Sequence, residues 1–372
     1  MNADIIVIGG GVIGCSVAWH LRQSGIENVV LIEAGESIAS ETSAAGAGYV
    51  SLWNREPELE RYALKFWPEL AERSGNDIRL KRNGFLEISD ASLDLREMFR
   101  AQIGLPATDS QAARPVSLGE LTKLVPILDL DAITQAVHFP GSLSISVQDG
   151  TRALARNAGK VLLNTTVIGI LIRGGRVAGV QTPGGKIEAP VVVNAAGAWI
   201  GKVHALAGLP ALPMRIYAAA RAVSEPLDIP RDFPMMILHY APDRCVYVRE
   251  ESGGLLFGHV RLKEGNDSLP DQPGRPRQWT EHDLAQTAEE CAWMIPALRG
   301  AKLRSILRGF PVDTPDTHPY IGETELPGFY LVGGCNQHGA NVGPGLGKLT
   351  AELITTGRTS LDIRPWRLSR FQ

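Results

Sequence analysis

The sequence predicts an α/β fold in which a domain with a parallel sheet is joined to an α+β domain with a mixed sheet. Three observations support this prediction. The apolar run Ile5–Ile8 is followed at once by spaced glycines. A second glycine-rich segment, 334–347, follows another apolar run near the C-terminus. Between them, segments within 213–310 alternate between apolar and polar residues, which is typical of an antiparallel sheet with one free face.

The first glycine-rich segment has the pattern G-x-G-x-x-G, formed by Gly9, Gly11 and Gly14 where a strand gives way to a helix. The first glycine of such a motif permits a tight turn, the second lets the backbone approach a pyrophosphate, and the third lets the helix pack closely on the strand. The helix adds unpaired N–H groups and a partial positive charge. The motif predicts a diphosphate-binding turn, and an ordinary glycine turn in a βα unit is the alternative.

A carboxylate ends the next predicted strand, 29–32. Glu33 follows the glycines by about 20 residues, the spacing at which an acid accepts hydrogen bonds from the ribose of an adenine dinucleotide. Its negative charge would repel a 2′-phosphate. The turn and Glu33 together predict a dinucleotide ligand without that phosphate.

The composition is that of an ordinary globular enzyme. The 372 residues suffice for two domains, and 44% of them are hydrophobic. A net charge of −3 argues against a surface that attracts nucleic acid or anionic membranes. The four cysteines are far apart without a C-x-x-C spacing, so neither a metal site nor a disulfide framework is predicted.

The N-terminal apolar run is short, is interrupted by glycines and lacks the basic segment and cleavage site of a signal peptide. We therefore expect no transmembrane segment and no signal peptide. A cytoplasmic location follows as the default expectation.

The remaining pattern predicts alternating helices and strands. Helices are expected over 12–23, 59–70, 93–103, 117–124, 150–157, 283–294 and 349–356, and before 206. Strands are expected over 84–88, 160–163, 215–224, 244–249, 255–260 and 328–334. Segments 167–172, 177–181 and 187–193 predict a three-stranded meander. Its last strand leads into the small residues 194–198, which repeat the strand-to-helix geometry of the N-terminus, so this strand should join the same sheet.

Small residues dominate the segment 40–49. They would let the backbone come close to a flat ligand, and Thr42 and Ser43 could bind phosphate or cap a helix. A flexible loop is the alternative. Because a nucleotide needs only one glycine-rich turn, the second turn at 334–347 predicts a longer ligand that reaches across the sheet, such as FAD.

Together these motifs resemble the D-amino-acid oxidase superfamily of flavoproteins, especially its sarcosine oxidase, glycine oxidase and dye-linked L-proline dehydrogenase branches. The resemblance covers nearly the whole chain. It is carried by Gly9–Gly14 with Glu33, Thr42–Gly48, Val193–Trp199, Thr314–Asp316 with Pro319–Gly322, and Gly334–Gly347. It implies a Rossmann-like FAD-binding domain of discontinuous segments, 1–80, 145–212 and 318–372. A mixed-sheet α+β substrate domain, 81–144 and 213–317, would cover the flavin.

The resemblance also implies which residues hold FAD: the diphosphate turn, the ribose carboxylate, the small-residue loop, an adenine contact and the C-terminal turn. These are Gly9, Gly11, Val12, Ile13, Gly14, Glu33, Ala34, Thr42, Ser43, Ala45, Gly46, Ala47, Gly48, Val167, Ala196, Gly197, Gly334, His338, Gly339, Gly345, Leu346 and Gly347. Some members link the flavin covalently through a His or Cys in the early loop. Ala45 stands there in this chain, so non-covalent FAD is expected.

The reaction implied is oxidation of a C–N bond by hydride transfer to flavin N5, giving an imine that hydrolyses. The substrate would be a D-amino acid, a proline-like or N-methyl amine, or an opine. The electron acceptor would be O₂, a quinone or a partner subunit in a hetero-oligomer.

Four residues are candidates for the chemistry. Tyr247 occupies the place of a substrate-facing tyrosine in the family, and Arg249, two residues further, shares its strand face. Arg249 could pair with a substrate carboxylate or be a solvated surface residue. Arg308 could replace the family's arginine clamp, where this chain has Pro311, or form an ordinary salt bridge. His338 lies in the predicted flavin turn, with a structural hydrogen bond as the alternative.

Two other functions stay open. A nicotinamide-dependent dehydrogenase would explain the N-terminal motif but not the C-terminal turn. A flavin subunit of a hetero-oligomeric dye-linked dehydrogenase, mainly relaying electrons, would explain both.

Overall fold

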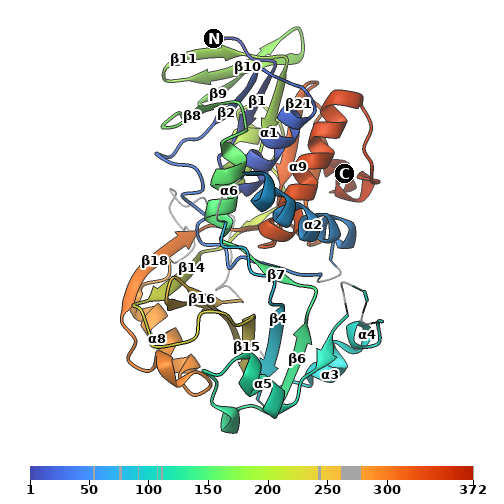
Figure 1. Ribbon diagram of the computed structural model, residues 1–372. Helices are drawn as coiled ribbons and strands as arrows, with labels where there is room; N and C mark the ends of the chain where they lie inside the picture. Colours follow the sequence, from blue (N-terminus) through green and yellow to red (C-terminus); the bar gives the residue numbers. More distant parts are fainter. Residues whose placement is uncertain are drawn as a thin grey trace.

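The computed structural model describes residues 1–52, 55–74, 78–90, 92–106, 108–109, 112–241, 244–260 and 278–371. They form two lobes, each built around one large sheet (Figure 1). The predicted α/β class and the mixed second sheet are confirmed. No helix in these described ranges has the length and apolar character needed to cross a membrane.

The first lobe contains a six-stranded sheet with the order β20-β21-β12-β1-β2-β8. Neighbouring strands are parallel except for β20 and β21. The strands are β1 (Ile5–Ile8), β2 (Val29–Ile32), β8 (Lys160–Leu162), β12 (Val191–Asn194), β20 (Tyr320–Glu323) and β21 (Phe329–Gly333). This lobe is therefore assembled from discontinuous segments, and β12 pairs directly with β1 as predicted.

Both faces of this sheet are covered, which explains the continuous apolar run of β1. Ile5 and Val7 pack among α1 (Val12–Gln23), α2 (Pro57–Ser74), α6 (Val147–Ala155) and α9 (Gly339–Thr356). Ile6 and Ile8 pack on the opposite face, against the meander β9 (Gly169–Arg173), β10 (Arg176–Thr182) and β11 (Gly185–Glu188), and against α7 (Ile200–Ala205). Successive side chains of a strand point to opposite faces, so one short run anchors both layers.

The second lobe contains an eight-stranded sheet with the order β18-β14-β17-β16-β15-β4-β6-β5. Its only parallel pair among the described strands is β15 with β4. The strands are β4 (Phe85–Ser89), β5 (Arg114–Pro115), β6 (Gln135–Phe139), β14 (Ala219–Ser224), β15 (Met235–Ala241), β16 (Arg244–Glu251), β17 (Gly254–His259) and β18 (Leu303–Gly309). One face carries α5 (Leu118–Leu124) and α8 (Glu281–Cys291), and the other faces the first lobe (Figure 1).

Shorter elements join the two lobes. The two-stranded pairs are β3 (Tyr49–Val50) with β7 (Leu143–Ser144), and β13 (Arg215–Ile216) with β19 (Val312–Asp313).

The predicted helix 93–103 is instead two short helices, α3 (Leu95–Met98) and α4 (Arg100–Ile103), separated at Phe99. Ser117 caps α5, since its hydroxyl accepts from the N–H of Glu120.

Further sequence predictions were wrong in their boundaries. The segment 215–224 is two strands, β13 and β14, which belong to different sheets. The segment 187–193 is not one strand, because β11 ends at Glu188 and β12 begins at Val191 in another sheet. The final helix begins at Gly339, whereas the sequence predicted a glycine-rich turn up to residue 348. Pro344 inside this helix leaves the carbonyl of Ala340 without its usual helical donor. The indole N–H of Trp67 donates to that carbonyl at 2.8 Å.

The glycines of this segment form one face of α9. Gly339, Gly343 and Gly347 recur every four residues and face α1, where added Cβ atoms would meet Val12 and Ser16. The pattern that predicted a ligand-binding turn is therefore, in large part, a surface for close packing of two helices.

This packing gives a testable prediction for stability. A Cβ at position 347 would lie 2.2 Å from Ser16 Oγ and 2.6 Å from the Ser16 carbonyl carbon. Overpacking of this kind costs roughly 1–3 kcal/mol, so Gly347→Ala should lower the free energy of unfolding by about that amount in urea titrations. The control is Gly119→Ala in α5, where nothing lies within 4 Å. Gly119→Ala should be neutral or stabilising, and equal effects of the two substitutions would contradict the packing argument.

Candidate active site

A single cavity of about 1110 Å³ connects the two lobes. Its wall includes the turn Gly9–Ile13 in the first lobe, the loop 45–49 between the lobes, and Tyr247 and His239 in the second. The carboxyl ends of β1, β2 and β12 open into it, as is usual for ligand sites in parallel sheets.

The N-terminal turn is shaped by close backbone contacts. Gly9 has a φ of +113°, and a Cβ there would lie 2.4 Å from the carbonyl oxygen of Ala195. A Cβ on Gly14 would lie 2.0 Å from the carbonyl oxygen of Gly9. Gly14 does not line the cavity; it lets α1 rest on the end of β1. Gly11, Val12 and Ile13 do line it.

Glu33 stands beside this turn on the cavity wall. Its Oε2 accepts from the N–H of Gly10 at 2.7 Å, and its Oε1 accepts from the N–H of Gly35 at 2.6 Å. The two backbone donors fix the carboxylate at the end of β2. Ala34 also lines the cavity.

The loop with small residues, 42–48, lines the cavity along its length except at Ala44. Ser43 Oγ accepts from the N–H of Val12 at 2.9 Å, so this hydroxyl stands at the N-terminus of α1. Thr42 Oγ1 instead accepts from the N–H of Phe310 at 2.9 Å, which ties the loop to the second lobe. A Cβ on Gly48 would lie 2.0 Å from the carbonyl oxygen of Ile145. Glycine is therefore needed at this position for packing within the protein, whether or not a ligand is bound.

The C-terminal turn follows β21 and lines the cavity from Gly333 to Asn341. Asn336 and Gln337 adopt left-handed conformations with φ of +48° and +69°, which is unusual for residues with side chains. Asn336 Oδ1 accepts from the N–H of Thr314 at 2.8 Å, and its Nδ2 donates to the carbonyl of Gly334 at 2.7 Å. The Thr314–Asp316 motif therefore supports this turn from outside.

Three residues predicted for this turn lie elsewhere. Gly345, Leu346 and Gly347 are buried within α9 against α1 and α2 and do not line the cavity. The helix begins at Gly339, so at 1.5 Å per residue these positions are about 9 Å or more along its axis. By contrast, Gly334, His338, Gly339, Val167, Ala196 and Gly197 are all on the cavity wall.

Of the four residues predicted for the chemistry, two reach the cavity. Tyr247 lines it, and its phenol lies over Gly258 on the adjacent strand, where a Cβ would meet the phenol oxygen at 2.5 Å. Burial raises the pKa of Tyr247 to about 12. His338 also lines the cavity, and burial together with the charge of Arg55 lowers its pKa to about 4. His338 is therefore neutral at physiological pH.

The two arginines do not reach the cavity. Arg249 is buried behind the loop, where its Nε donates to the carbonyl of Ala47 at 3.0 Å and its Nη2 lies 2.6 Å from Glu251. Arg308 is exposed on β18, the edge strand, with its Nε donating to the carbonyl of Trp279 at 3.0 Å. Side-chain direction on a strand predicts the face correctly but not which part of that face a cavity occupies.

The cavity wall also contains a buried ion pair that was not among the residues predicted from the sequence. His239 Nε2 lies 2.5 Å from Glu87 Oε2, and the Glu87 side chain is only 1% exposed. Burial opposes protonation of His239, but hydrogen bonds to Cys245 and Glu87 and the Glu87 charge raise its pKa to about 9. Burial raises the pKa of Glu87 as well, against the effect of His239. A signal was present, because Glu87 interrupts an otherwise apolar, fully buried strand.

Three further cations line the cavity: Arg55, Lys202 and Arg244. Burial raises the pKa of Asp313, and the charge of Arg55, which also acts on His338, partly opposes that rise. Within the described part of the chain, no cluster of His, Cys, Asp and Glu has the arrangement of a metal site.

These features define a class of protein: a two-lobed α/β protein in which one cavity joins a glycine-rich strand-to-helix turn of the first lobe to the sheet of the second. Residues 4–353 match the model of the DAO family, described as FAD dependent oxidoreductase, and the chain belongs to this family. The glycine turn, the glutamate and the volume of the cavity fit the FAD that this family uses.

Individual relatives agree with this assignment. The chain is 30% identical to mitochondrial sarcosine dehydrogenase of Mus musculus over 100% of its own length and 41% of that protein. It is 25% identical to glycine oxidase of Geobacillus kaustophilus, with 99% and 97% covered. The crystal structure of L-proline dehydrogenase from P. horikoshii superposes with a TM-score of 0.82 at 26% identity, covering 100% and 98%. The chain thus spans less than half of some curated relatives.

The geometry of Glu33 gives a prediction for cofactor binding. Glu33→Gln removes the negative charge and one of the two carboxylate oxygens that accept hydrogen bonds from the backbone N–H groups of Gly10 and Gly35. Hydrogen bonds to charged groups contribute roughly 1.5–3 kcal/mol, so FAD affinity should fall by about tenfold or more, measured by quenching of flavin fluorescence. The matched variant Glu36→Gln removes an exposed carboxylate outside the cavity wall and should leave affinity unchanged.

The Glu87–His239 pair gives a prediction for pH. The folded-state pKa of His239, about 9, lies above its ordinary value of 6.5, so its stabilising contribution is complete below pH 6.5 and is lost as the pH rises towards 9. Burial raises the pKa of Glu87, so this carboxyl also lowers stability with rising pH, but it does so from its ordinary pKa of 4.5 upwards. The free energy of unfolding should therefore decrease between pH 6.5 and 9. The decrease should be smaller in His239→Gln, and an identical pH profile in that variant would refute the assignment.

Proposed function

We propose that this protein oxidises the C–N bond of an amino acid or secondary amine with non-covalently bound FAD. The observation that carries the proposal is the single cavity that joins the Gly9–Ile13 turn to Tyr247. FAD, when bound, supplies the hydride acceptor for such an oxidation. The relatives named for sarcosine, glycine and proline support a small amine as the substrate.

The cavity wall suggests where each part of FAD would be held. Gly9, Gly11, Val12 and Ser43 would meet the diphosphate, and Glu33 the ribose. Ala45–Gly48 would lie along the ring, with the N-terminus of α9 at its pyrimidine edge. Val167, Ala196 and Gly197 are placed to contact the adenosine and ribityl parts. These residues come from 1–80, 145–212 and 318–372, which supports the proposed division into domains.

The substrate end combines one charge pair, cations and aromatic rings. Arg55 and Arg244 offer positive charge to a substrate carboxylate, taking the role first expected of Arg249 and Arg308. Tyr247 would orient the donor carbon, and the Glu87–His239 pair gives the otherwise apolar wall near Ile237 and Phe99 one polar contact. Sites of this kind obtain specificity from a few polar groups in an apolar wall.

A non-covalent cofactor is supported by Ala45 on the cavity wall, since an alanine side chain cannot bond to the flavin. Acid precipitation tests this: all the FAD should appear in the supernatant. Yellow colour retained in the pellet would show a covalent link.

A flavin subunit of a larger assembly is the second candidate. It is favoured by the length of relatives such as sarcosine dehydrogenase, of which the chain covers 41%. Partner subunits, the electron acceptor and the cytoplasmic location stay predictions from the sequence.

Anaerobic titration tests the function. FAD-loaded protein mixed with D-amino acids, proline, N-methyl amino acids or opines should bleach at 450 nm (about the usual flavin maximum) without added nicotinamide. Bleaching by no amine would favour the relay subunit, and a colourless protein that refuses FAD would refute both. Fast reoxidation by O₂ identifies an oxidase, and a need for dyes identifies a dehydrogenase.

Tyr247→Phe should slow the bleaching by about tenfold, the value of one hydrogen bond to the substrate. The matched control is Tyr240→Phe on β15, whose hydroxyl donates to Glu290 at 2.8 Å and which does not line the cavity. Equal rates of bleaching in the two variants would show that Tyr247 does not contact the substrate.

A further inference from the structure

Two arginines of the eight-stranded sheet hold the loop 45–48 from behind. Arg221 Nη1 donates to the carbonyl of Gly46 at 2.8 Å, and Arg249 Nε donates to the carbonyl of Ala47 at 3.0 Å. Both side chains belong to buried residues, 5% and 4% exposed. Because Gly46 and Ala47 line the cavity, each guanidinium is one peptide group away from whatever the cavity binds.

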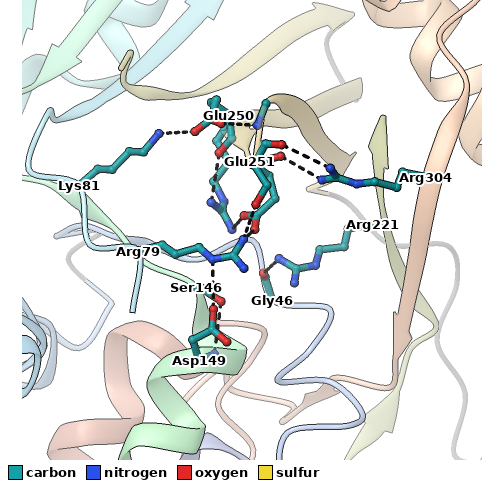
Figure 2. A network of polar contacts seen from close by, with 12 residues as sticks. Gly46, Arg79, Lys81, Ser146, Asp149, Arg221, Glu250, Glu251 and Arg304 are labelled. Carbon is teal, nitrogen blue, oxygen red and sulfur yellow. Dashed lines mark hydrogen bonds and ion pairs between the residues drawn. The ribbon is translucent and has the colours of Figure 1, made fainter. Parts of the chain in front are cut away.

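The charge of Arg249 is neutralised. Its Nη2 lies 2.6 Å from Glu251 Oε2, and Glu251 also pairs with Arg79. Arg79 in turn lies 3.3 Å from Asp149 on α6, so a chain of ion pairs joins the two lobes beside the loop (Figure 2).

Arg221 differs from Arg249 in this respect. Among the described residues no carboxylate lies within ion-pair distance of Arg221, and its Nε has no hydrogen-bond partner. In Figure 2 its guanidinium points only to Gly46. Burial and the neighbouring charge of Arg249 lower its pKa to about 10, although the more distant charge of Glu251 opposes this effect, so Arg221 is still a cation at neutral pH. A buried cation without a carboxylate at ion-pair distance is costly, and an anion bound nearby offsets that cost.

We propose that Arg221 is a positioning residue whose buried charge, acting through the Gly46 peptide, makes the cavity favour an anion and raises the midpoint potential of bound FAD. Two-electron reduction of a flavin with uptake of one proton leaves one negative charge on the ring, which a nearby cation stabilises. The inference rests on the proposed function, because it takes the loop 45–48 to face the flavin.

The test compares three variants of the FAD-loaded protein. Arg221→Gln retains a donor for the Gly46 carbonyl but loses the charge, and Arg221→Lys retains the charge. Arg304→Met removes an exposed arginine of the same network, which donates to the carbonyls of Glu251 and Ser252. The readouts are the midpoint potential and the dissociation constant for sulfite, which adds to flavin N5 and leaves a negative charge on the ring.

Arg221→Gln should lower the midpoint potential and weaken sulfite binding by about tenfold or more, the size expected for one charge at low dielectric constant. Arg221→Lys should stay close to the wild type in both readouts. Arg304→Met should not differ from the wild type, because solvent and salt screen an exposed charge.

Three outcomes would overturn the inference. FAD-loaded Arg221→Gln with unchanged potential and sulfite affinity would show that the charge has no effect. Equal losses in the Gln and Lys variants would show that Arg221 only anchors the loop. Wild-type protein that binds no FAD would overturn the proposed function itself, which separates that failure from the first two.

Discussion

The site depends on the close packing of two helices, α1 and α9, against each other on one face of the parallel sheet. Gly339, Gly343 and Gly347 give α9 a face without side chains, and this face rests on Val12 and Ser16 of α1. At the start of α1, Gly14 rests on the carbonyl of Gly9 in the same way. These contacts bring two helix N-termini, from opposite ends of the chain, to one cavity. Each terminus carries the partial positive charge of its helix, which favours an anionic ligand.

The second lobe places several charged groups in buried positions within and behind the rest of the wall. Glu87 and His239 neutralise each other, as do Arg249 and Glu251, whereas Arg221 has only a carbonyl for a partner among the residues that the structure describes. Buried ions are costly unless they are paired, so an unpaired one is a feature that packing alone does not explain. The loop 45–48 lies between the two arginines, Arg221 and Arg249, and the cavity and connects the two halves of the site.

Much of the first lobe could be predicted because its signals are local. The run Ile5–Ile8 must be buried on both faces, and the structure divides its side chains between two cores. The helix cap at Ser117 and the turns of the meander also follow from short-range chemistry. The start of α9 could not be predicted this way, because glycine and proline disfavour a helix locally. Packing against α1, and the bond from Trp67 to the Ala340 carbonyl, reverse that preference.

By itself, the sequence determined the class of fold, the glycine-rich turn with Glu33 beside it, and the small-residue loop, since each is encoded within a few neighbouring residues. Only the tertiary structure decided which charged side chains face the cavity. Arg249 and Arg308 lie on strands of the second sheet, but Arg249 points behind the loop 45–48 and Arg308 points to solvent. Arg55, Glu87 and His239 reach the cavity wall instead. The physical reason is that a strand fixes the face on which a side chain lies, whereas the position of a cavity along that face depends on how two separate sheets pack together.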